Sequence, residues 1–231
     1  MNWPSKIIND INSILLPSVC FGCNVQLSGG EYLLCTVCRH DLPLTDHNFT
    51  EENAVDRIFY GRVPVEKAAS FLYFSKQGVV KNLLHYLKYK NQQNVGEFIG
   101  EWFGAKMASE DVLHIDVVIP VPLHTKKLKK RGYNQVELFG RKLSSHLKAK
   151  YRDDVLVKTQ NTKTQTKKSR LARWKNNQDL FVIKNSKGIA DKNLLLVDDV
   201  ITTGATIEAC ATTLLQIPNV KIYVATMAVV P

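Results

Sequence analysis

The chain has 231 residues, of which 45% are hydrophobic and 23% are charged. This length suffices for one α/β core with a small appendage, and the charge content is ordinary for a soluble protein. No apolar run approaches the roughly 20 residues of a membrane-spanning helix, so we expect no transmembrane segment.

The N-terminal segment, residues 1–17, predicts a short amphipathic helix that docks on the body of the protein. Its apolar residues fall at helical spacing between Trp3 and Leu15. A secretion signal fits poorly, because Asp10 interrupts the segment and its apolar runs are too short. Attachment to a membrane surface is a weaker alternative, since the polar face is not rich in Lys and Arg.

Four cysteines follow in two Cys-x-x-Cys pairs, Cys20 with Cys23 and Cys35 with Cys38. Each pair places two thiolates on one tight turn, and two such turns supply the four sulfurs of a tetrahedral zinc site. Two disulfides are the main alternative, but they suit a secreted chain, and a redox pair is a further alternative. We predict a structural zinc ion, because four thiolates close its coordination shell. Cys210 stands apart, and we interpret it as a small core residue.

A polar connector at residues 45–56 predicts a boundary between an N-terminal module, residues 1–50, and a larger domain, residues 57–231. In the larger domain, apolar strands alternate with amphipathic helices, which is typical of a mostly parallel sheet flanked by helices on both faces. The expected strands are residues 68–74, 115–121, 155–157, 193–197 and 220–230. The expected helices are residues 78–90, 95–107, 134–150, 169–177 and 205–216.

The positive charge of the chain is local. The formal net charge is +10, yet residues 120–175 hold 17 Lys and Arg against three acids, a net charge of +14. The remainder of the chain therefore carries a net charge of −4. A local excess of this kind indicates an anionic partner such as a polyphosphate or a nucleic acid, with an ordinary solvated surface as the alternative.

The most informative motif begins at the apolar strand of residues 194–197 and ends at an expected helix. Two acids, Asp198 and Asp199, follow the strand, and then comes a turn rich in hydroxyl groups, from Thr202 to Thr206. Ligands of parallel sheets bind beyond the carboxyl ends of the strands, and a helix N-terminus favours an anion. We expect the turn to hold a phosphate, with Gly204 allowing close approach of the backbone. The alternative is a capping segment in which a Thr caps the helix.

The two acids are suited to vicinal ribose hydroxyls or, through water, to magnesium. Two adjacent acids at the end of a buried strand are costly, and a capping segment does not account for them. The predicted ligand-binding residues of this motif are Asp198, Asp199, Val200, Thr202, Thr203, Gly204, Ala205 and Thr206.

Residues 194–206 resemble the phosphoribosyl pyrophosphate signature of the type I phosphoribosyltransferases. The chain as a whole resembles the ComF family. This resemblance rests on the signature, on the four cysteines and on four further segments, residues 121–124, 131–135, 164–166 and 170–177. The resemblance implies a phosphoribosyltransferase fold, a cytoplasmic location and a role in natural transformation, in which incoming single-stranded DNA is handled by the DNA-uptake machinery. It also implies phosphoribosyl pyrophosphate with magnesium as the ligand.

Phosphoribosyl transfer needs cations at the leaving pyrophosphate and acids near the ribose. We therefore assign catalytic roles to Asp198, Asp199 and Arg131, with Arg131 at the pyrophosphate. Asn134 and Gln135 are predicted to contact the ribose or the acceptor, although a helix cap explains Asn134 equally well. Lys88 is interpreted mainly as a surface lysine that extends its charge into solvent. No general base is evident.

Arg170, Arg173 and Trp174 mix guanidinium and aromatic groups, as surfaces that bind single-stranded DNA do. A solvated helix anchored by Trp174 explains them equally well. Two hypotheses for the function follow. The first is an enzyme that transfers phosphoribosyl groups to an unknown acceptor, and the second is a non-catalytic, ligand-gated module that binds single-stranded DNA. The sequence alone does not decide between them.

Overall fold

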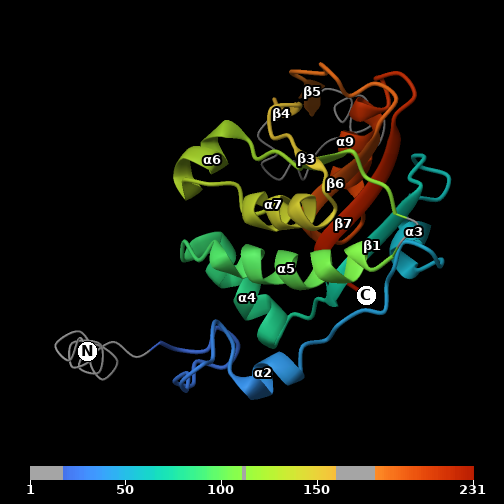
Figure 1. The fold of residues 1–231 in the computed structure, drawn as a ribbon. Coiled ribbons are helices and arrows are strands. Elements are labelled where there is room, and N and C mark those ends of the chain that lie inside the picture. Colours follow the sequence, from blue (N-terminus) through green and yellow to red (C-terminus); the bar gives the residue numbers. More distant parts are fainter. Residues whose placement is uncertain (1–17, 111–112, 160–179) are drawn as a thin grey trace, which may run out of the picture.

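The computed structural model describes residues 18–110, 113–159 and 180–231. Within them, five strands form a parallel sheet in the order β1-β7-β6-β2-β3, with β6 and β7 at its centre (Figure 1). The strands are β1 Lys67–Tyr73, β2 Val117–Pro120, β3 Lys150–Tyr151, β6 Asn193–Ile201 and β7 Lys221–Val229. The expectation of a mostly parallel sheet is confirmed.

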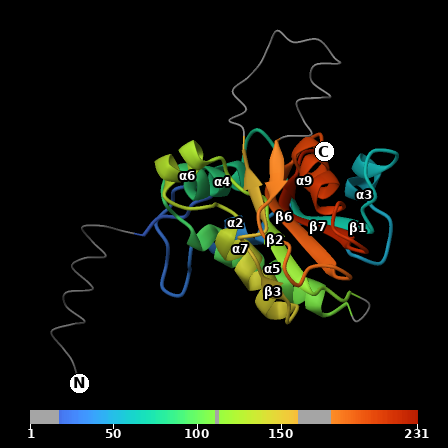
Figure 2. The same ribbon diagram turned by 90° about the horizontal axis from the view of Figure 1, so that it is seen from above.

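Helices cover both faces of this sheet, and Figure 2 shows the two layers. One face packs against α4 Val79–Tyr89, α5 Asn94–Ala108 and α7 Glu137–His146, and the other against α3 Ala54–Phe59 and α9 Ala205–Leu214. Strand β6 is apolar on both sides: Leu195 and Val197 belong to the first core, and Leu194 and Leu196 to the second. This accounts for its continuous apolar sequence.

Three shorter elements lie near the carboxyl edge of the sheet. Helix α6 Thr125–Arg131 follows β2, and β4 Leu156–Lys158 pairs with β5 Phe181–Ile183 in an antiparallel ribbon. The ribbon flanks residues 160–179, so the helix expected at residues 169–177 lies outside the described residues, as does the one expected at residues 1–17. No helix among the described residues is long and apolar enough to cross a membrane.

The cysteine module, residues 18–42 with helix α2 Thr36–His40, packs on α4 (Figure 1). The Phe21 and Tyr86 rings stack with centroids 4.2 Å apart, and Asn82 Nδ2 donates to the Gly22 carbonyl at 2.7 Å. Cys20 and Cys38 belong to the same hydrophobic core as α4 and α5. The module is therefore held by apolar and polar contacts, while its separation as a domain remains a prediction.

The connector between the module and β1 is more structured than its polar sequence indicates. Thr45 and Phe49 are buried, and the Thr45 amide donates to the Phe71 carbonyl of β1 at 2.9 Å. Helix α3 then begins inside the expected connector, because Asn53 and Asp56 form a capping box at its N-terminus. Strand β6 also differs from expectation, since it does not end at Val197: its pairing with β7 continues to Ile201.

Close packing of α5 on α7 generates a stability prediction. A Cβ at Gly100 would lie 2.8 Å from the Phe139 carbonyl oxygen, whereas a Cβ at Gly96 would keep 3.4 Å from its nearest neighbour. Replacing a helical Gly by Ala gains about 1 kcal/mol in helix propensity, but overpacking costs about 1–3 kcal/mol. We expect Gly100→Ala to lower the free energy of unfolding by up to about 2 kcal/mol in urea titrations.

Gly96→Ala is the matched control in the same helix, and its stability should equal or slightly exceed that of the parent chain. Equal stability of the two variants would contradict the close contact between α5 and α7.

Candidate functional site

The loop between β6 and α9 forms a small hollow at the carboxyl edge of the sheet. Its volume is about 50 Å³, and it is lined by Asp198, Val200, Ile201, Thr202, Thr203, Gly204, Ala205, Thr206 and Ile207. The residue that caps α9 is Gly204, and no side chain caps this helix. The first amides of α9 are therefore left without a capping side chain, contrary to the alternative of a Thr cap. A helix N-terminus of this kind favours an anion, and the binding of a phosphate here remains a prediction.

Gly204 is required by the protein itself and not only by close approach of a ligand. Its φ is +73°, and a Cβ would lie 2.5 Å from Ile58 Cγ2 of α3. Next to it, Arg62 Nη1 donates to the Thr203 carbonyl at 2.6 Å, and Arg62 Nη2 pairs with Glu208 of α9. Sequence reasoning missed Arg62, which buttresses the loop from a segment 141 residues away.

The two acids point to opposite faces of the sheet, because they are consecutive residues of one strand. Asp199 faces α4, where its Oδ2 lies 2.9 Å from Lys88 Nζ. Asp198 faces α9, close enough to Cys210 for the two groups to interact electrostatically. Lys88 is therefore a component of the site rather than an ordinary surface lysine.

Burial sets the Asp198 carboxyl group apart from an ordinary surface acid. Burial of its carboxyl group, with the nearby Asp199 charge as a second cause, raises the pKa of Asp198 to about 7. The Asp199 amide donates to Asp198 Oδ1 at 2.8 Å, and this hydrogen bond opposes the shift. A cation or a hydroxyl donor beside the acids would relieve this electrostatic cost, so the pair fits a magnesium ion bound through water, or ribose hydroxyls.

A cationic cleft adjoins the acids. Its volume is about 360 Å³, and its lining residues are Lys88, Tyr89, Asn91, Lys127, Lys130, Arg131 and Tyr133. The Arg131 guanidinium lies 5.8 Å from the centre of the Tyr89 ring. Four cations around one cleft favour a multiply charged anion such as a pyrophosphate.

Asn134 and Gln135 make contacts within the protein. Asn134 Nδ2 donates to the Val121 carbonyl at 3.0 Å, and its Oδ1 accepts from the Val136 amide at 3.3 Å. The buried Gln135 accepts a hydrogen bond from Arg131 and so orients the guanidinium. These bonds give both residues a positioning role, and direct contact with a ligand remains a prediction.

The remaining residues fall in three places. His124 caps α6, because its Nδ1 accepts from the Lys126 amide at 3.2 Å. Cys210 is fully buried, as expected for a core residue. Arg170, Arg173 and Trp174 lie outside the described residues.

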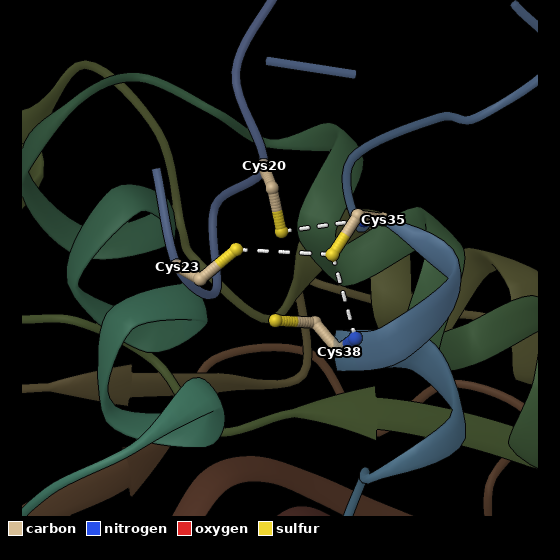
Figure 3. A group of neighbouring side chains, drawn as sticks. All are labelled: Cys20, Cys23, Cys35 and Cys38. Carbon is tan, nitrogen blue, oxygen red and sulfur yellow. Dashed lines mark hydrogen bonds between the residues drawn. The ribbon is translucent and has the colours of Figure 1, made fainter. Parts of the chain in front are cut away.

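The four paired cysteines converge at one point (Figure 3), with their sulfur atoms all within 4.8 Å of one another. The amides of Gly22 and Cys35 donate to Cys20 Sγ at 3.3 and 3.2 Å. A Cβ at Gly22 would lie 2.8 Å from Cys38 Sγ, so the first turn requires glycine. All four cysteines are free thiols, contrary to the disulfide alternative.

The electrostatics of this cluster favour a cation. Burial, together with the neighbouring Cys23 and Cys20 thiols, raises the pKa of Cys38, so the cluster resists holding several thiolates unaided. A metal ion removes this cost by binding the thiolates. Four convergent sulfurs with amide donors fit such an ion, and their number leaves no open position for catalysis.

Comparison with known proteins agrees with this geometry. Residues 136–230 match the model of the phosphoribosyl transferase domain. The DNA utilization protein YhgH of Escherichia coli O6:H1 is 24% identical over 224 residues, which cover 88% of this chain and 93% of the relative. Competence protein F of Haemophilus influenzae is 36% identical over 93 residues, or 40% of this chain and 41% of the relative. These relatives agree with the resemblance of the chain to the ComF family.

Among solved structures, the chain is similar to the glutamine phosphoribosylpyrophosphate amidotransferase of Bacillus subtilis. The identity is 16% and the TM-score 0.43, over 63% of this chain and 30% of that protein. The chain thus spans less than a third of the amidotransferase.

The raised pKa of Asp198 gives a pH-dependent stability prediction. An acid whose pKa is higher in the folded state than in the unfolded state destabilises the fold at high pH. The loss of stability grows as the pH rises from the pKa of the unfolded state to the pKa of the folded state. Asp198→Asn removes the charge, so we expect this variant to be more stable than the parent at pH 8 by on the order of 3 kcal/mol. The advantage should shrink as the pH is lowered to 5 and be measurable by denaturant unfolding across that range.

Asp199→Asn is the comparison variant: it removes the second cause of the raised pKa of Asp198 but also the partner of Lys88, so its gain at pH 8 should be smaller than that of Asp198→Asn. A gain for Asp198→Asn that does not change with pH would show that the buried charge is not its cause.

Proposed function

We propose that the chain binds phosphoribosyl pyrophosphate with magnesium and acts as a phosphoribosyltransferase-like protein in DNA uptake during natural transformation. The observation that carries this proposal is the order of three features along one sheet edge. The phosphate-sized hollow, the two acids and the cationic cleft follow one another, and Lys88 links the acids to the cleft. A sugar with a phosphate at one end and a pyrophosphate at the other has the same order of charges.

Each end of the ligand then meets its own kind of donor. The hollow at Thr202–Thr206 offers helix amides and hydroxyls to the 5′-phosphate. The ribose then lies between the hollow and the cleft, beside the two acids of β6. Arg131 and its neighbouring lysines face the pyrophosphate. Magnesium, when bound, would neutralise the charge that develops on the leaving pyrophosphate.

The role in DNA uptake is supported by the relatives, which are named for competence and for DNA utilization. Within this role, the transfer of a phosphoribosyl group to an acceptor is one reading. The alternative is a module that binds the ligand without turnover and, through its basic surface, binds single-stranded DNA.

Calorimetric titration with magnesium and phosphoribosyl pyrophosphate tests the ligand directly. Thr206→Val removes one hydroxyl from the phosphate loop and should weaken binding about tenfold, which corresponds to about 1.4 kcal/mol. Thr212→Val, at an exposed position of the same helix, is the control and should leave the affinity unchanged. Absence of binding by the parent chain would reject the proposal.

Release of pyrophosphate then separates the two readings in the same samples. Release that depends on an added acceptor supports transfer. Tight binding without release, for all nucleobase, nucleotide and single-stranded DNA acceptors, would reject the enzyme and favour the binding module.

We also propose that the metal of the cysteine cluster is zinc and that its role is structural. One zinc ion per chain should be found by elemental analysis of the purified protein. Cys20→Ser and Cys35→Ser should lose this ion and melt at a lower temperature, because the cysteine module packs on α4. Cys210→Ser, which changes a buried thiol outside the cluster, should keep it. Full zinc content in the first two variants would contradict the assignment.

A further inference from the structure

Lys88 occupies a position that its place on a surface helix does not explain. It lies one turn after Leu84 on α4, and both Leu84 and Leu87 are buried against the sheet. Its side chain is 24% exposed and that of Asp199 is 10% exposed, with 2.9 Å between Nζ and Oδ2. The ion pair is therefore largely removed from solvent, at the edge of the sheet where a ligand is expected.

The same ammonium group borders the cationic cleft with Lys127, Lys130 and Arg131. It is thus the one residue found both in an ion pair with the acids of β6 and in the lining of the cleft, among the residues that the structure describes. On one side it pairs with Asp199. On the other side it adds to a group of cations, Lys127, Lys130 and Arg131, for which no ion pair is found in the part of the chain that the structure describes. An anion in the cleft would therefore offer Lys88 a second negatively charged partner.

We propose that Lys88 is a ligand-binding residue that exchanges partners. Without ligand it neutralises Asp199. When magnesium and phosphoribosyl pyrophosphate bind, Asp199 turns to the magnesium-bound water or the ribose hydroxyls, and Lys88 contacts the pyrophosphate. This inference rests on the proposed function. It assigns to the site a cation of α4, which lies outside the signature at residues 194–206.

The exchange has a consequence that a structural lysine would not produce. Lys88 and a divalent cation compete for the Asp199 carboxylate, so removal of the ammonium group should favour the metal when no sugar is present. The same change removes a donor from the pyrophosphate and should weaken the complete ligand. One substitution is thus expected to shift two affinities in opposite directions.

The test uses the full zinc-containing chain with Lys88→Met, which keeps the apolar stem. Manganese alone, as a spectroscopic substitute for magnesium, is titrated by electron paramagnetic resonance, and magnesium with phosphoribosyl pyrophosphate is titrated by calorimetry. We expect manganese to bind at least threefold more tightly and the sugar at least tenfold more weakly. Lys81→Met, at an exposed position of the same helix, should change neither affinity.

Lys88→Arg keeps the positive charge and should recover most of the affinity for the sugar, which guards against a folding defect in Lys88→Met. Unchanged or weaker manganese binding in Lys88→Met overturns the exchange, as does unchanged affinity for the sugar, and both results leave the proposed function standing. Failure of the parent chain to bind the sugar overturns both.

Discussion

Strand β6 is the element on which the rest of the site depends. It is hydrogen-bonded to β2 on one side and to β7 on the other, and an apolar core covers each of its faces. A strand held in this way cannot slip by one residue, because a slip would exchange the side chains of its two faces. The positions of Asp198 and Asp199 are therefore fixed before any ligand arrives, and their opposite orientations follow from strand geometry.

The fixed strand also determines which elements must reach it. Asp199 meets α4, and α4 lies between the sheet and the cysteine module, with Leu83 and Leu87 in the core and Tyr86 stacked on Phe21. A metal ion held by the four cysteines would thus limit the movement of α4, which carries Lys88, without contacting a ligand at the sheet edge. This gives the N-terminal module a mechanical connection to the sheet edge.

Apolar periodicity and residue spacing are local signals in the sequence. They predict the strands and helices of the core and the residues that could share one metal ion. The alternation of apolar strands and amphipathic helices gave the parallel sheet, and the spacing of Cys20 to Cys38 gave the cluster of four sulfurs. What escaped prediction depends on distant contacts. Helix α3 is short and follows a polar stretch, while Arg62 and Lys88 are ordinary cations until the fold brings them to Thr203 and Asp199. Strand β6 was expected to end at its acids, because pairing with β7 is invisible in the periodicity of β6 alone.

The separation of the two anion-binding regions has a further physical meaning under the proposed function. The hollow before α9 offers neutral amides and hydroxyls, whereas the cleft at Arg131 offers full charges, and the two acids keep these regions apart. A ligand that fills both regions loses its freedom of movement once and gains both sets of contacts, so the second contact forms at a high effective concentration. A ribose phosphate without pyrophosphate gains only the weaker set and leaves Lys88 with Asp199. Selectivity for the longer anion then arises from the spacing of the two regions along the edge of the sheet rather than from the strength of either one.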